Sequence, residues 1–218
     1  MPRVSRGGRP SRAQAEKLGE RILEAATALF LVHGYGATSI EQVARRARVS
    51  KRTFYHRFDD KAALFAAVVH RIVDSLRPAG GAPSFEGLDF PGTLRQIAEL
   101  ILQASLSAQG VALHRLIVGE SARFPQLAAV VNKDGSSEEA VGLIAELLGR
   151  EARAGRIKLK KPDFAARQFL HMIIAVPQRR AMGLGPPMSA TEVREWPRDV
   201  VELFLQGCSW RASPRKTR

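Results

Sequence analysis

The chain has 218 residues, 45% hydrophobic and 25% charged, which is the composition of a globular protein with a buried core. Its 34 Lys and Arg outnumber 21 Asp and Glu, and the net charge of +13 favours a polyanionic partner, with nucleic acid ahead of an anionic membrane surface. Because Cys208 is the single cysteine, an internal disulfide and a cysteine-rich metal site are excluded, and a reducing, cytoplasmic location is expected.

The N-terminal residues 1–14 have the composition of a flexible basic arm. Four arginines there face no acid, and two glycines and two prolines disfavour a helix. No apolar stretch follows this positive charge, so the pattern is not that of a signal peptide. No run in the chain approaches 18 apolar residues, so neither a membrane span nor a membrane partner is predicted.

From residue 15 onward, apolar residues recur at spacings of three and four, which predicts a chain made of helices. The first helix is expected over 15–33, and Gly34 and Gly36 are expected to end it, because glycine readily adopts a left-handed turn. No alternating strand pattern is present. The fold class is therefore predicted to be all-α.

Two short helices are predicted next. Thr38 and Glu41 are spaced as a capping box for the first, and Ser50 is a good N-cap for the second, expected over 51–58. The pair Asp59-Asp60 is expected to cap a fourth, strongly apolar helix.

A linker is predicted at 78–89, where proline and glycine gather, and a larger helical bundle is predicted beyond it. Its expected helices are 90–108, 110–122, 125–132, 137–153, 163–182 and 190–207. The predicted organisation is a basic arm (1–14), a three-helix helix-turn-helix domain (15–75), an effector-binding and dimerisation domain (76–210) and a basic tail (211–218).

The chemistry is concentrated at residues 38–58. Six basic residues and no acid lie between Arg45 and Arg57, and Phe54 and Phe58, four apart, are expected to face the core. A helix that then presents Lys, Arg, Thr, Tyr and His outward at its N-terminus suits docking in the major groove. The alternative interpretation is a solvated basic face on an ordinary bundle.

The same region resembles the TetR family of regulators. The matching motifs lie at 22–26, 29–30, 33–35, 38–40, 43–44, 49–51, 53–58, 61 and 64–65, including Val49-Ser50-Lys51 and Thr53-Phe54-Tyr55-His56-Arg57-Phe58. One departure is Arg52, where many members carry glycine.

The resemblance implies DNA contacts for ten residues. Contacts to backbone phosphates are implied for Thr38, Lys51, Thr53, Tyr55 and Lys61, and base-facing positions for Ser39, Gln42, Arg52 and His56; Ser50, at the helix N-cap, completes the candidate set. The arm arginines are candidates for the adjacent minor groove or phosphates.

Beyond residue 76 the chain resembles the AefR-like subgroup of this family, through residues 114–127. That resemblance implies a bundle that holds a small-molecule effector and a homodimer built on the last two helices. Periodicity agrees, because His171 is the one polar residue between Phe169 and Val176, and so apolar a helix needs cover on more than one side. A fully internal helix in a monomer is the alternative.

The effector pocket is predicted to involve His114, Phe124, Phe169, His171 and Met172. The two histidines also fit hydrogen-bonded core or interface positions. No metal site, cofactor or catalytic residue is predicted, because no metal-ligand spacing, nucleophile elbow, phosphate-binding loop or dinucleotide motif is present.

The predicted function is therefore a sequence-specific DNA-binding regulator, most simply a repressor released by an effector, and not an enzyme. Its expected partners are an inverted-repeat operator in double-stranded DNA, a second copy of the chain and an unknown small molecule. The rival is an architectural DNA binder without sequence preference, which the net charge alone permits.

Overall fold

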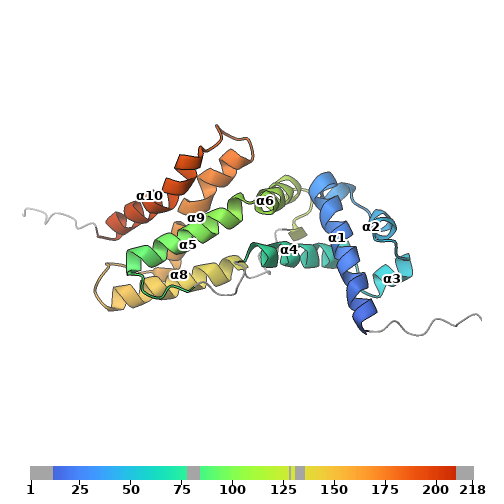
Figure 1. Ribbon diagram of the computed structural model, residues 1–218, viewed down its shortest axis with the longest axis horizontal. Coiled ribbons are helices and arrows are strands. Elements are labelled where there is room, and N and C mark those ends of the chain that lie inside the picture. Colours follow the sequence, from blue (N-terminus) through green and yellow to red (C-terminus); the bar gives the residue numbers. More distant parts are fainter. Residues whose placement is uncertain (1–11, 78–83, 128, 131–135, 210–218) are drawn as a thin grey trace, which may run out of the picture. The chain divides into compact units, whose positions relative to one another are not determined.

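The computed structural model describes residues 12–77, 84–127, 129–130 and 136–209 (Figure 1). Every regular element within these ranges is a helix, which confirms the predicted all-α class. Most of the predicted arm and the predicted tail lie outside the described residues. Among those described, no helix combines the length and apolar character needed to cross a bilayer.

The chain forms two compact units. The first contains residues 1–71 and 116–131, and the second contains 72–115 and 132–218. The sequence-based division at 75/76 did not separate 116–131, because the grouping of this segment with residues 1–71 depends on contacts distant in sequence.

The first unit is built on α1 (Arg12–Ala37), α2 (Ile40–Arg46), α3 (Lys51–Tyr55) and the first part of α4 (Lys61–Leu76). Its core consists of fully buried side chains that recur at helical spacing, among them Ile22, Phe30, Val43, Phe54, Phe65 and Val68. Burying large apolar side chains is the main favourable term in forming so small a unit.

The second unit contains α5 (Phe90–Leu106), the start of α6 (Ala108–Glu120), α8 (Ser136–Arg153), α9 (Pro162–Ala181) and α10 (Ala190–Ser209). Helix α9 packs against α5, α8 and α10, and its Phe169 and Ile173 are fully buried. These bounds lie within three residues of the predicted ones. Of the helix predicted at 125–132, residues 126–127 and 129–130 are helical, and the rest of its second half lies outside the described residues.

The connection between α9 and α10 is held by Arg180. Its guanidinium donates to the carbonyl oxygens of Pro186 and Pro187, at 2.5 and 3.0 Å, and to the Glu192 carboxylate at 3.0 Å. Glu192 also accepts from the Ser189 amide in a capping box, and these hydrogen bonds, that from Arg180 first, lower the pKa of Glu192 to about 2. The last two helices therefore form a fixed hairpin.

Candidate nucleic-acid interface

Helix α2 begins with a capping box formed by Ser39 and Gln42. The Ser39 hydroxyl accepts from the Gln42 amide at 3.2 Å, and the Gln42 side-chain oxygen accepts from the Ser39 amide at 2.6 Å. The predicted box of Thr38 and Glu41 was wrong by one residue. Thr38 is buried, and its hydroxyl instead donates to the Gly34 carbonyl at 2.8 Å.

The turn between α2 and α3 is a Schellman motif with an arginine in the left-handed position. The Val49 amide donates to Ala44 at 2.9 Å, the Arg48 amide donates to Arg45 at 3.1 Å, and Arg48 itself has φ 53°. Glycine is usual at such a position, because a side chain there crowds the backbone.

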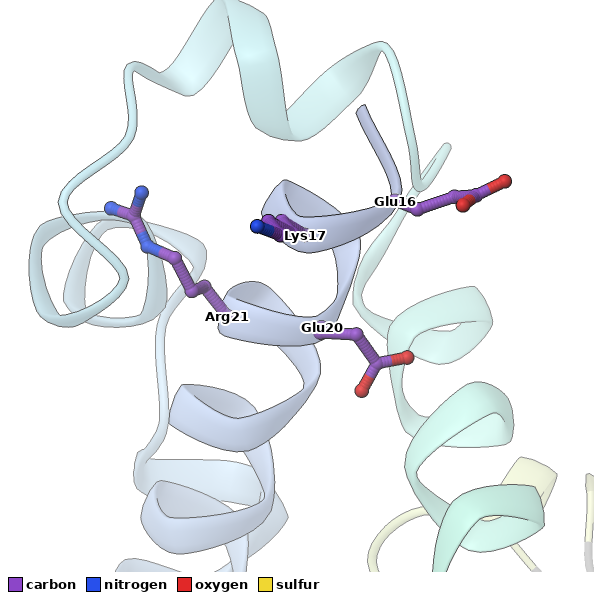
Figure 2. Close-up of a pocket in the computed structure, with 4 residues that line it drawn as sticks. All are labelled: Glu16, Lys17, Glu20 and Arg21. Carbon is purple, nitrogen blue, oxygen red and sulfur yellow. The ribbon is translucent and has the colours of Figure 1, made fainter. Parts of the chain in front are cut away.

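Arg21 of α1 stabilises this turn from the side. Its guanidinium donates to the carbonyl oxygens of Ala47 and Arg48, which the end of α2 leaves without helical partners. Figure 2 shows Arg21 and Lys17 on one side of α1, with Glu16 and Glu20 on the other; the four side chains line a shallow pocket. Glu20 pairs with Arg71 of α4, so α1 contacts both the turn and α4.

We expect Arg48→Gly to raise the free energy of unfolding by about 1 kcal/mol, because it removes the cost of a left-handed non-glycine residue. Arg46→Gly is the matched control. It also removes one arginine, but from the last turn of α2, where glycine should cost about 0.5–1 kcal/mol. Urea unfolding of both variants measures the difference, and equal effects at the two positions would contradict a strained Arg48.

Helix α3 is a five-residue helix whose N-cap is the predicted Ser50. The Ser50 hydroxyl accepts from the Thr53 amide at 3.1 Å and lies 2.8 Å from the Thr53 hydroxyl. Phe54 is fully buried, whereas Tyr55 is 51% exposed and Arg52 and His56 are also exposed. The short helix thus turns one aromatic into the core and leaves the candidate DNA-contacting side chains outside.

Lys51 is already paired with an acid in the structure. Its ammonium lies 2.5 Å from the Glu41 carboxylate on α2. The hydrogen bond between them lowers the pKa of Glu41 and raises the pKa of Lys51. A phosphate at Lys51 would compete with this carboxylate.

Four other cations on this surface have no such partner among the described residues. Within the described part of the chain, no ion pair involves the exposed Arg45, Arg46, Arg48 or Arg52. Four uncompensated guanidinium groups on α2, its turn and α3 form a surface suited to phosphates and to guanine edges.

Lys61 lies against residues 34–37, the end of α1 beyond its kink at Gly34, which we call the glycine loop. Its ammonium donates to the Gly36 carbonyl at 3.4 Å and sits 4.3 Å from the centre of the Tyr35 ring, and burial lowers the pKa of Lys61. The Lys61 side chain, predicted to contact a DNA phosphate, is therefore partly engaged in contacts with this loop.

Two residues of the 116–131 segment also contact this loop. The Gly36 amide donates to the Glu120 carboxylate at 3.2 Å, and the Phe124 ring meets the Tyr35 ring edge-on at 5.0 Å. Gly34 has φ 84° and ψ 166°, and a Cβ there would lie 2.3 Å from Glu120 Oε1. We call Gly34, Tyr35, Gly36, Glu120 and Phe124 the glycine-loop clamp.

The predicted effector residues are divided between the two units. Phe124 belongs to the glycine-loop clamp in the first unit, and the other four belong to the second. Phe169 is buried against Phe204, and Met172 packs on the same core. His171 is exposed beside the Arg167 carbonyl, and burial lowers the pKa of His114.

Sequence reasoning missed three residues that shape the interface: Arg21, Glu41 and Glu120. Arg21 and Glu120 act across 26 and 84 residues, and no local pattern marks such contacts. Glu41 had a detectable signal, as the one acid in the first turn of α2, but its spacing from Thr38 predicted a capping box instead.

Two protein families match this chain. Residues 22–68 match the family described as bacterial regulatory proteins, tetR family. Residues 92–207, more than half of the chain, match the AefR-like transcriptional repressor, C-terminal domain.

Individual proteins are similar as well. The HTH-type transcriptional activator FasR of Mycolicibacterium smegmatis is 37% identical over 68 residues, 31% of each chain. The HTH-type transcriptional regulator TcmR of Streptomyces glaucescens is 28% identical over 142 residues, 62% of this chain and 60% of TcmR. The chain thus spans between about a third and three fifths of the length of these two curated relatives.

Solved structures match over more of their length. The flavonoid-responsive regulator FrrA is 30% identical, with a TM-score of 0.73 over 90% of this chain and 100% of FrrA. A protein from Mesorhizobium loti described as a TetR-family transcriptional regulator is 27% identical, with a TM-score of 0.69 over 91% of this chain and 98% of that one.

Proposed function

Because this chain belongs to the TetR family and carries an AefR-like C-terminal domain, we propose that it is a sequence-specific DNA-binding transcriptional regulator. One observation carries the proposal: α2, a tight turn and α3 present unpaired cations, hydroxyls and an exposed tyrosine on one short, capped recognition element. The proposed contacts are Lys51, Arg52, Thr53, Tyr55 and His56. Ser39, Ser50 and Gln42 serve first as caps, and the Gln42 amide nitrogen remains as a donor.

We further propose that the protein is a cytoplasmic repressor whose DNA affinity a small molecule controls. The name of its C-terminal family describes a repressor, and FrrA is described as flavonoid-responsive. In the second unit the Gln96 side-chain oxygen on α5 is buried and finds no hydrogen-bond partner among the described residues. A ligand hydroxyl would satisfy such a group.

A homodimer through α9 and α10 is part of this proposal. Residues 164, 168, 171 and 175 of α9 form an exposed face at helical spacing, and Phe164 is 61% exposed. On α10, Leu203 is 62% exposed. Exposed apolar side chains on a fixed hairpin suit an interface with a second copy.

We expect the purified chain to sediment at about twice its 23.9 kDa mass, and Leu203→Lys to weaken dimerisation at least tenfold, because an unpaired charge is costly in an interface. Leu143→Lys is the control, since Leu143 on α8 is also 62% exposed and lies off the hairpin. Sedimentation across a concentration series distinguishes them. A monomeric wild type, or equal weakening by both substitutions, would remove the α9–α10 interface.

The DNA-binding function is tested by selecting bound sequences from a random pool of duplexes and footprinting the protein on the selected sequences. A two-fold dimer with two recognition elements should select inverted repeats whose half-sites are separated by whole turns of the duplex. If the selected sequences were unrelated and asymmetric, they would instead favour an architectural DNA binder.

A further inference from the structure

A second cationic surface lies in the unit that does not contain the recognition helix. Residues 150–161 hold six basic residues and one acid, and all six basic side chains are exposed. We call these six the basic strap: Arg150, Arg153, Arg156, Lys158, Lys160 and Lys161. The whole second unit has 19 Lys and Arg against 14 Asp and Glu, so outside the strap its charges balance.

The end of α8 and the segment after it place these six side chains on the surface of the second unit. Arg150 and Arg153 are three residues apart on the exposed face of α8, which ends at Arg153 and is followed by Gly155, with φ 74°. Burial then alternates, because Ile157 is buried and Leu159 packs on the core while the residues between and beside them are exposed. The strap therefore has a fixed backbone, with its apolar side chains facing inward.

One acid anchors the strap and leaves most of its charge uncompensated. Glu151, 8% exposed, accepts two hydrogen bonds from Arg156, at 2.5 and 2.8 Å, and the hydrogen bonding lowers the pKa of Glu151. The other five cations form no ion pair with any described residue. Elsewhere in this unit arginines do pair, as in Arg77–Glu139, Arg167–Glu138, Arg180–Glu192 and Arg198–Asp199.

We propose that the basic strap is a second, sequence-independent DNA-binding surface, which holds phosphates of duplex outside the operator contact. A row of like charges, five of the six forming no ion pair with a described residue, is stabilised by a polyanion, and each phosphate bound releases condensed counterions. The strap offers no apolar side chain to insert into a bilayer, because Ile157 and Leu159 face the core. Its chemistry therefore fits a phosphate backbone better than a lipid surface.

The test uses the full chain on a mixed-sequence duplex across a salt series. The strap variant replaces Arg153, Lys158, Lys160 and Lys161 with Gln, and the control variant replaces Arg95, Arg115, Arg179 and Arg194, four exposed arginines of the same unit, with Gln. Both lose four charges. If all four strap cations bind phosphate, the slope of log K against log salt should become shallower by about three to four per bound protomer in the strap variant. The control should change it by less than one.

Two further measurements make the result decisive. For the strap variant, affinity for a short duplex holding only the selected operator should stay within about twofold of wild type, because its recognition helix is intact. If the proposed function itself is wrong, the wild type will show no preference for the operator over other duplexes. Lys160→Gln/Lys161→Gln should give about half the change in slope if the fourfold variant does not fold. Equal slopes for the strap and control variants would overturn the proposal. The proposal would also be overturned if the strap variant lost binding to anionic phospholipid vesicles while its salt slope on DNA stayed that of the wild type. That result would assign the strap to a membrane surface.

Discussion

Replacing Gly34 with alanine is expected to lower the free energy of unfolding by about 2 kcal/mol. Gly34 has φ 84° and ψ 166°, a conformation that is essentially restricted to glycine and costs other residues about 1–3 kcal/mol. The new Cβ would also lie 2.3 Å from Glu120 Oε1, so the carboxylate would have to leave the Gly36 amide. Urea unfolding followed by circular dichroism measures the change.

Two companion variants separate the causes. Gly36 does not have a positive φ, and a Cβ there would lie 3.1 Å from Phe124, so Gly36→Ala should cost less than about 1 kcal/mol. Glu120→Ala removes the carboxylate that the new methyl group at position 34 would meet. Gly34→Ala combined with Glu120→Ala should then cost less than the sum of the two single changes. A Gly34→Ala variant as stable as the wild type would contradict the backbone geometry described for this loop.

Replacing Arg52 with alanine should weaken binding to the selected operator by about 1–3 kcal/mol, or roughly 5- to 150-fold, and weaken binding to a scrambled duplex much less. Arg52 is exposed on α3, forms no ion pair with a described residue, and carries the planar fork that matches a guanine edge. Fluorescence anisotropy on both duplexes measures the two affinities. If both fall by the same factor, Arg52 binds phosphate and specificity lies in Gln42, Ser39 or His56.

Lys51→Ala is the comparison for Arg52. Lys51 lies at the N-terminus of α3, where the helix dipole attracts anions, so its loss should weaken binding to both duplexes alike and reduce the salt slope by about one. Glu41→Gln should have the opposite effect, because it removes the carboxylate that competes for Lys51. If none of these substitutions changes binding, α3 does not read DNA.

The helical architecture could be predicted because the helices carry local signals. The apolar stripe of α4 and the Ser50 cap of α3 are visible within a few residues of chain. The start of α2 was misplaced, since Thr38 and Ser39 are equally good caps by type. What distinguishes them is the Gly34 carbonyl, which the Thr38 hydroxyl reaches only once the end of α1 has formed.

Long-range contacts account for most of what sequence reasoning missed. Phe124, a predicted effector-pocket residue, packs its ring on Tyr35, 89 residues earlier in the chain, and no local pattern marks that contact. The left-handed conformation of Arg48 was equally hidden, because arginine is an uncommon residue for it and the supporting Arg21 lies 27 residues away. Such partners become visible only when the unit is assembled.

The hydrogen bond to the Glu120 carboxylate also makes the Gly36 amide a probe of whether the 116–131 segment is docked. The Gly36 amide hydrogen, held by this acceptor from a segment 84 residues away, should exchange slowly with deuterated solvent as long as 116–131 stays docked. Ligands that detach this segment would speed exchange at this one glycine before any helix unfolds. Deuterium uptake at Gly36 would therefore report whether a small molecule reaches the DNA-binding unit, even while that molecule's identity is still being sought.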